Sequence, residues 1–191
     1  MDAAIVKANG LAADESWLDF GCGCGRIARH FDQRGRPSVL AGLDVDADAV
    51  SWCARFLKGS FKPVNARPPA PFADGSFDVA YSVSVFSHLD EEPQLAWLAE
   101  IHRLLRARGL LVVSTHSPSL TWTRPDLTAE QSRRLDETGF LFAPGQGRFN
   151  DDSAFHSEAY LRGAWTRHFE LVAFSAGGLA GYQDLSTWRK R

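Results

Sequence analysis

The feature that most constrains the fold is a glycine-rich turn between a short apolar run and a helical pattern. The run Ser16–Phe20 is followed by Gly21, Gly23 and Gly25, and a helix is expected from Ile27. A strand that passes through glycines into a helix lets the backbone approach a ligand closely, with the helix N-terminus facing it. Binders of nucleotides and of dinucleotides share such a turn, so it predicts an α/β fold without specifying the ligand.

Further apolar runs rich in branched residues alternate with helical patterns along the chain. They lie at residues 38–44, about 61–65, 77–81 and 110–115. This alternation favours an α/β fold with a mostly parallel, doubly wound sheet. Two last runs, 169–174 and 182–188, are joined by the glycine-rich link 177–181, which favours an antiparallel pair.

Length and composition favour one globular domain spanning residues 1–191. Hydrophobic residues make up 45% of the chain, and its formal net charge of -2 offers no general attraction to nucleic acid or anionic lipid. No apolar run approaches the roughly 20 residues of a membrane span. The three cysteines make no disulfide framework, and no ligand spacing predicts a metal site. We therefore expect a reduced, cytoplasmic protein with neither nucleic acid nor membrane as partner.

Residues 117 to about 155 interrupt the alternation of strands and helices. They contain a capping box at residues 128–131, a helix that Gly139 should end, and a stretch with Pro144, Gly145 and Gly147. Loops of this kind carry specificity while the scaffold persists. We expect a lid or substrate insertion here.

An acidic residue provides the second element of the site. Asp44 ends the second apolar run, 25 positions after Asp19. Adjacent strands of a doubly wound sheet bring their carboxyl ends to one crevice, where a carboxylate can accept both hydroxyls of a ribose. A helix cap or loop acid is the alternative role for Asp44. Arg26 stands where a dinucleotide fingerprint needs its third glycine, which counts against a dehydrogenase.

Four segments, in order, resemble class I S-adenosylmethionine-dependent methyltransferases. Leu18–Arg26 resembles the first motif of that family, Gly42–Asp44 the second, and Pro71–Val79 the segment leading into the fourth strand. Leu104–Leu110 is similar to the stretch entering the fifth strand, with Ala107-Arg108 in place of the usual Pro-Gly. The resemblance covers about residues 11–116. It implies S-adenosylmethionine as cofactor and a Rossmann-like seven-stranded sheet, with one antiparallel strand in its C-terminal hairpin.

The resemblance also assigns roles to the residues that match the motifs. Asp19, Gly21 and Gly23, with Cys22 in the same turn, would surround the methionine part of the cofactor. Asp44 would hold the ribose and Val45 would pack on the adenine. The remaining matches are Asn65 and Ala66 near the adenine amine, where the family often has Asp-Ala, and Ser82 near the sulfonium.

Methyl transfer needs a general base only when the acceptor must lose a proton. Three histidines, His88, His116 and His156, follow expected strands or the insertion. We name His88 as the candidate base, with His156 as the weaker one, although a surface or capping role is the ordinary expectation for any single histidine. The expected acceptor is a small hydroxylated metabolite or a sugar carried on a larger molecule. The end of the fourth run lacks the Asn/Asp-Pro-Pro-aromatic motif of enzymes that methylate base amines.

Two alternatives stay open at this point. One is a non-catalytic S-adenosylmethionine-binding module of a larger protein, and the other is a Rossmann-type oxidoreductase or epimerase. Relatives usually carry an N-terminal helical cap, which is short or missing in this chain, so the chain can be a fragment. Its oligomeric state is open as well.

Overall fold

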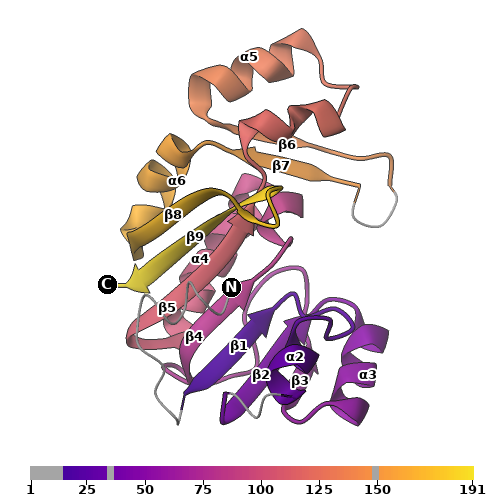
Figure 1. Cartoon of the computed structure of the whole chain (residues 1–191), viewed down its shortest axis with the longest axis vertical. Coiled ribbons are helices and arrows are strands. Elements are labelled where there is room, and N and C mark those ends of the chain that lie inside the picture. Colours follow the sequence, from indigo (N-terminus) through magenta and orange to yellow (C-terminus); the bar gives the residue numbers. More distant parts are fainter. Residues whose placement is uncertain (1–14, 34–36, 148–150) are drawn as a thin grey trace.

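A seven-stranded sheet forms the centre of the molecule in the computed structural model, which describes residues 15–33, 37–147 and 151–191 (Figure 1). The strands lie in the order β3-β2-β1-β4-β5-β9-β8. Their bounds are β1 Ser16–Phe20, β2 Val39–Asp44, β3 Ser60–Pro63, β4 Phe77–Ser82, β5 Leu105–Thr115, β8 Phe169–Leu179 and β9 Gln183–Lys190. The segment of the expected N-terminal cap lies outside the described residues.

The direction of the strands confirms the predicted fold class. Strands β1 to β5 pair in parallel, whereas β9 runs antiparallel to both of its neighbours, β5 and β8. The chain winds from β1 through β2 to β3 and then returns to place β4 on the other side of β1. In such sheets ligands bind at this reversal, outside the carboxyl ends of the strands.

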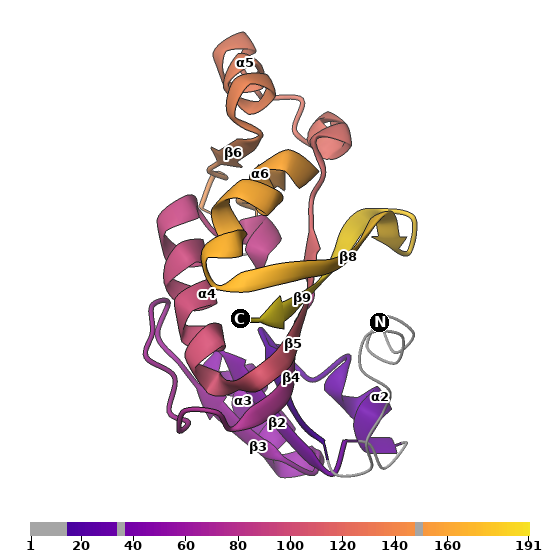
Figure 2. The same ribbon diagram turned by 90° about the vertical axis from the view of Figure 1, so that its left-hand side faces the viewer.

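Helices cover both faces of the sheet, which explains why its central strands are buried. Helix α4 (Glu91–Leu104) and helix α6 (Glu158–Ala164) lie on one side, and α2 (Ala28–Gln33) lies on the other (Figure 2). Helix α3 (Ala47–Phe56) packs with α2, and the short 3-10 helices are η1 Phe86–His88, η2 Pro118–Thr123 and η3 Trp165–Arg167. No helix of the described residues is long and apolar enough to cross a membrane.

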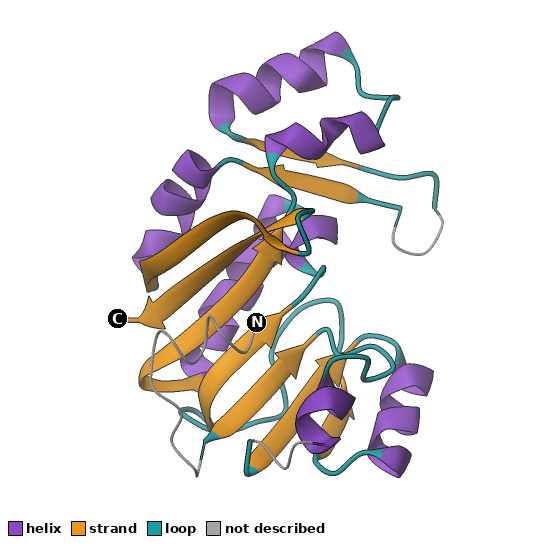
Figure 3. Cartoon of the chain, viewed as in Figure 1, coloured by secondary structure: helices purple, strands orange, loops and turns teal. Residues whose placement is uncertain are grey.

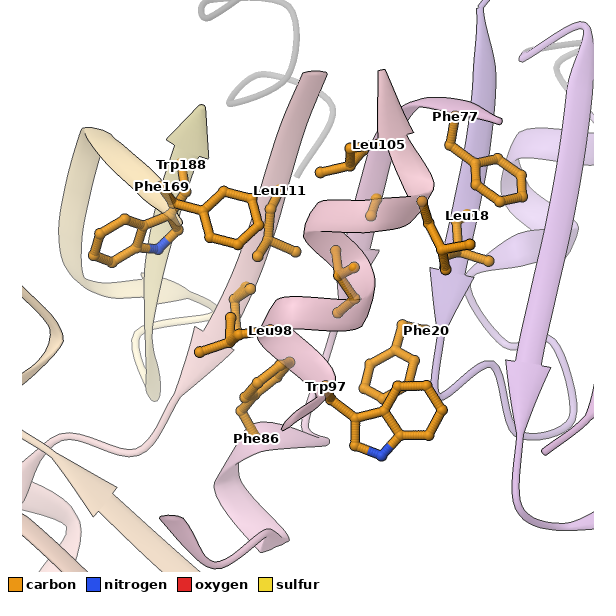
Figure 4. Packing of buried hydrophobic residues seen from close by; sticks show 14 of the residues in the cluster. Leu18, Phe20, Phe77, Phe86, Trp97, Leu98, Leu105, Leu111, Phe169 and Trp188 are labelled. Carbon is orange, nitrogen blue, oxygen red and sulfur yellow. The ribbon is translucent and has the colours of Figure 1, made fainter. Parts of the chain in front are cut away.

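The period-two alternation of β1 divides the core into two clusters. Leu18 and Phe20 point to the α4 side, where they pack with Trp97 and Leu98 (Figure 4). Trp17 points to the opposite face and contacts Phe31 of α2, with ring centroids 4.8 Å apart. Burial on both faces fixes the register of β1, because a shift by one residue would exchange the two sets.

The insertion, residues 117–155, contains a helix and a hairpin that sequence analysis only partly anticipated. Helix α5 (Ala129–Thr138) begins at the predicted capping box and ends at Gly139, whose φ of 74° is left-handed. Strands β6 (Phe140–Ala143) and β7 (Ser153–His156) form a separate antiparallel pair beyond the large sheet (Figure 3). Leu120, Leu135, Leu141 and Phe155 give this unit its own small hydrophobic cluster.

Two bounds differ from the sequence prediction by five residues each. Strand β5 begins at Leu105 rather than at Leu110, and β8 continues to Leu179 rather than ending at Phe174. The added parts are an irregular pairing of β5 with β4 near Phe77 and a shifted register between β8 and β9. Bulged pairing lacks the alternation on which a strand prediction depends.

Candidate active site

A cavity of about 610 Å³ opens at the carboxyl ends of β1, β2 and β4. This is the crevice that the strand order predicts for a ligand. Its lining combines the glycine turn after β1, the residues that follow β2 and β4, and Asp152 of the insertion. The cavity therefore joins segments that lie up to about 130 residues apart in the chain.

The three glycines of the turn have left-handed φ values of 81°, 48° and 72°, and each meets a different neighbour. A Cβ at Gly21 would collide with Val85, and one at Gly25 would lie 2.6 Å from Leu57 Cδ1 on the α3 side. A Cβ at Gly23 would have only Asp44 Oδ2 within 4 Å, at 4.0 Å. Gly21 and Gly25 are thus needed for packing, whereas Gly23 leaves space for a ligand.

Asp44 holds this turn against the end of β2. Its Oδ2 accepts a hydrogen bond from the Gly23 amide at 2.6 Å, and its Oδ1 accepts one from the Asp46 amide at 2.9 Å. Each carboxylate oxygen can accept a further bond, so both oxygens keep acceptor capacity for ribose hydroxyls. Leu43 contributes as well, because its carbonyl accepts from the Gly21 and Cys22 amides at 2.8 and 3.0 Å.

Asp19 is a carboxyl group buried beside the turn. It is 2% exposed and lines the cavity, and its Oδ2 has no hydrogen-bond partner among the described residues. Burial raises the pKa of Asp19 to about 7, Tyr81 opposes that shift, and the nearby charge of Asp44 adds to it. A buried acceptor without a partner fits a cationic donor, such as the ammonium of the cofactor's methionine part.

The structure brings most of the expected cofactor residues to this cavity, but not all of them. Cys22, Val45 and Ala66 line it together with the residues above. Asn65 is exposed and Ser82 is fully buried, and neither lines the cavity. Ser84 lines the cavity instead of Ser82, because β4 continues through Ser82 and the chain turns only afterwards.

Ser84 is a functional candidate that sequence analysis missed. Its φ of 59° is left-handed, which is uncommon for a residue with a side chain. The Ser84 amide donates to Ser114 Oγ at 2.9 Å, and its hydroxyl donates to Gln183 Oε1 at 3.1 Å. These contacts connect the end of β4 to β5 and β9, and no local pattern in the sequence signals them.

Taken together, the site fits S-adenosylmethionine. Asp44 provides acceptors for the ribose, Asp19 provides one for an ammonium, and Gly23 leaves room beside both. Val45, 58% exposed at the rim, offers an apolar surface to a base. Among the described residues, no group of three or more His, Cys, Asp or Glu side chains is arranged to hold a metal ion.

His88 lies at the edge of the cavity, at the end of η1. Its Nδ1 is 2.7 Å from the carbonyl oxygen of Asp152 in the insertion. A carbonyl oxygen can only accept, so Nδ1 carries the hydrogen and Nε2 is left as a bare acceptor when the ring is neutral. The ring of His116 lies 5.9 Å from that of His88, between centroids. Burial, with a contribution from His88, lowers the pKa of His116 to about 4.

His156 has a different place from the one expected. It is 0% exposed, does not line the cavity, and its Nε2 lies 3.0 Å from Gln94 Oε1. The Gln94 amide nitrogen donates to the carbonyls of Phe86 and Leu89, which leaves its oxygen to accept from His156. Burial lowers the pKa of His156 to about 3. His156 is therefore not placed to act as a base in this cavity.

The comparisons with known proteins agree on one family. A family model described as a methyltransferase domain matches residues 18–113. The chain is 31% identical over 136 residues to an uncharacterised chloroplastic methyltransferase of Arabidopsis thaliana, covering 65% of this chain and 37% of the relative. It is 28% identical over 130 residues to a malonyl-[acyl-carrier protein] O-methyltransferase of Pectobacterium atrosepticum, covering 62% and 47%. The chain thus spans less than half the length of these relatives.

A solved structure extends the likeness to almost the whole fold. The structure of a SAM-dependent methyltransferase from Methanosarcina mazei has a TM-score of 0.75 with this chain. The match covers 98% of this chain and 96% of that one, at 21% identity. The likeness shows that the two chains share their fold.

We predict that Gly23→Ala weakens S-adenosylhomocysteine binding tenfold or more, because the added Cβ enters the space beside Asp44. The left-handed φ of 48° should also cost about 1–2 kcal/mol of stability. Gly181→Ala is the matched control, since Gly181 has a φ of 72° and open space around it. Calorimetric titration and thermal unfolding should show similar stability losses in both variants, with the affinity loss confined to Gly23→Ala. Equal affinities of the two variants for S-adenosylhomocysteine would contradict the assignment of the glycine turn to cofactor binding.

A second prediction follows from the raised pKa of Asp19. Below pH 7 the free protein holds this carboxyl largely protonated, and a bound ammonium favours the ionised form, so binding should release a proton. Affinity for S-adenosylhomocysteine should therefore rise from pH 5.5 to pH 7.5, by about twentyfold if only the ionised form binds. Titrations across this range test it, with Asp19→Asn as the variant whose affinity should be weak and nearly independent of pH. A flat profile for the unaltered protein would remove the assigned role.

Proposed function

The chain belongs to the methyltransferase domain family, with the fold of the class I S-adenosylmethionine-dependent enzymes, and on that premise we propose that it methylates a hydroxyl group. The proposed acceptor is a small hydroxylated metabolite or a sugar carried on a larger molecule. Family membership sets aside the oxidoreductase and epimerase alternative. When bound, S-adenosylmethionine supplies an electrophilic methyl group on a sulfonium, whose sulfur departs neutral and needs no acid.

The orientation of His88 is the observation that carries the proposal. With Nδ1–H donated to the Asp152 carbonyl at 2.7 Å, the lone pair of Nε2 is available at the cavity edge. A hydroxyl acceptor must lose a proton as it is methylated, and Nε2 can take it. The neutral state of His116 supports this role, because the neighbouring ring adds no positive charge to oppose protonation of His88.

The charges around the cavity favour a neutral acceptor over a carboxylate. Among the described lining residues, the carboxylates are Asp19, Asp44, Asp46 and Asp152, and Arg26 in the glycine turn is the one Arg or Lys. A malonyl group, the acceptor named for the Pectobacterium relative, carries a carboxylate that is already ionised. A site for such an acceptor would need a cation to bind the carboxylate, and it would need no base because the carboxylate has no proton to lose. Here the acceptor end offers a base, His88, and a carboxylate, Asp152.

The same proposal gives the insertion a role at the cavity. We propose that residues 117–155 act as a lid over the acceptor end of the cavity, because Asp152 already lines it. Excluding water there would leave the acceptor hydroxyl aligned with the methyl group.

The proposal also covers the partner and the location of the protein. A small-molecule or glycan partner suits the formal charge of -2 better than nucleic acid does. The three cysteines are free thiols, which supports a reducing, cytoplasmic location.

We predict that His88→Ala lowers the maximal rate by about a hundredfold or more, the usual contribution of a positioned base. Its affinity for S-adenosylhomocysteine should stay within about twofold, because the ribose and ammonium contacts come from other residues. The assay screens a panel of hydroxylated acceptors for release of S-adenosylhomocysteine and then compares variants on the best one. His30→Ala is the control, because His30 is exposed on α2, away from the cavity lining.

The possible results separate the alternatives. Full activity in His88→Ala would show that alignment alone drives the transfer and that no base acts at this position. Activity only on carboxylate acceptors would overturn the proposed acceptor class. Tight cofactor binding with no turnover of any acceptor would favour a non-catalytic binding module of a larger protein.

A further inference from the structure

A largely buried arginine connects the end of β6 with the residues that lead into β7. Arg124 follows η2, and its side chain is 13% exposed. Its Nη1 donates to the carbonyl of Ala143 at 2.8 Å, and its Nη2 donates to that of Pro144 at 3.0 Å. Nη1 also reaches the carbonyl of Asp151 at 3.5 Å, just before β7 begins. One guanidinium therefore joins the end of β6 to the start of β7.

Asp126 fixes the guanidinium from the other side. Its Oδ1 accepts from Arg124 Nε at 2.9 Å, and its Oδ2 accepts from Nη2 at 2.7 Å. This two-point pairing orients a planar guanidinium, which an ammonium could not reproduce. The pairing lowers the pKa of Asp126 to about 2, so the carboxylate stays ionised at neutral pH.

The residue after the clamped Asp151 is the one that contacts His88. The carbonyl of Asp152 accepts from His88 Nδ1 at 2.7 Å, while its Oδ1 accepts from the Gly145 amide at 2.8 Å. The same short segment is thus held by Arg124 at Asp151 and by Gly145 through the Asp152 side chain. A shift of this segment would move the carbonyl away from the His88 ring.

We propose that Arg124 is a positioning residue for His88, acting through the hairpin backbone to place the Asp152 carbonyl that holds Nδ1–H. The inference rests on the proposed function in one respect, that His88 is the base. Without the carbonyl, a neutral imidazole is free to carry its hydrogen on Nε2, and the atom that should take the proton is then blocked. Arg124 itself does not line the cavity, so its effect reaches the reaction through the segment that carries Asp152 and, from there, through His88.

The direct test is the tautomer of His88, read from imidazole nitrogen shifts in the nitrogen-15-labelled protein at pH 8. His88→Ala identifies the signals by their loss. We expect the unaltered protein to show hydrogen on Nδ1, and Arg124→Lys and Asp126→Asn to show a mixture or the Nε2–H form. Arg133→Gln is the matched control, since both ion pairs of Arg133, with Glu130 and Glu137, stay within α5.

Kinetics provide the second readout. With the acceptor found by screening, both variants should lose about ten- to a hundredfold in kcat, the loss seen when the outer hydrogen-bond partner of a metal-bound histidine is removed. Cofactor affinity should stay unchanged. Asp126→Asn keeps the test decisive if Arg124→Lys does not fold, because Asp126 is a surface residue with a 58% exposed side chain.

The outcomes distinguish this inference from the proposed function. An unchanged Nδ1–H tautomer in the variants, or an Nε2–H form in the unaltered protein, would overturn the positioning role. A tautomer change in the variants with full activity of His88→Ala would instead keep the link from Arg124 to His88 and reject His88 as the base.

Discussion

The hydrogen bond from the Gly23 amide to Asp44 is the contact on which the cofactor site depends. At 2.6 Å it ties the turn after β1 to the end of β2, and the Leu43 carbonyl reinforces it through the Gly21 and Cys22 amides. The parallel pairing of β1 and β2 brings these groups together, so the strand register determines the shape of the turn. The glycine turn is therefore already ordered in the free protein, which reduces the conformational entropy lost when a ligand binds.

The two halves of the cavity are built in different ways. The cofactor half comes from the turns after neighbouring strands, and its main polar contact joins the Gly23 amide to the Asp44 side chain. The proposed acceptor half depends on partners distant in sequence, such as His88 with Asp152 and Ser84 with Gln183. Short sequence motifs can therefore indicate the first half, whereas the second exists only in the folded chain.

This difference explains how much could be predicted from the sequence. The glycine turn, Asp44, the seven-stranded sheet with its C-terminal hairpin and the α5 cap follow from local chemistry or from a matched motif, and the fold class is confirmed. The β6–β7 hairpin escaped because its strands, Phe140–Ala143 and Ser153–His156, are four residues long and show no alternation of polar and apolar residues. Sequence analysis named Ser82 rather than Ser84 because the choice depended on where β4 ends. Strand propensity does not locate the end of a strand to within two residues.

The separate hydrophobic cluster of the insertion has an evolutionary consequence. Leu120, Leu135, Leu141 and Phe155 pack mainly with one another rather than with the two clusters that flank the sheet. Substitutions distant from one another and without shared partners have nearly additive effects on stability. Descendants of such a chain can therefore exchange or rebuild this unit while inheriting an intact glycine turn and Asp44 contact.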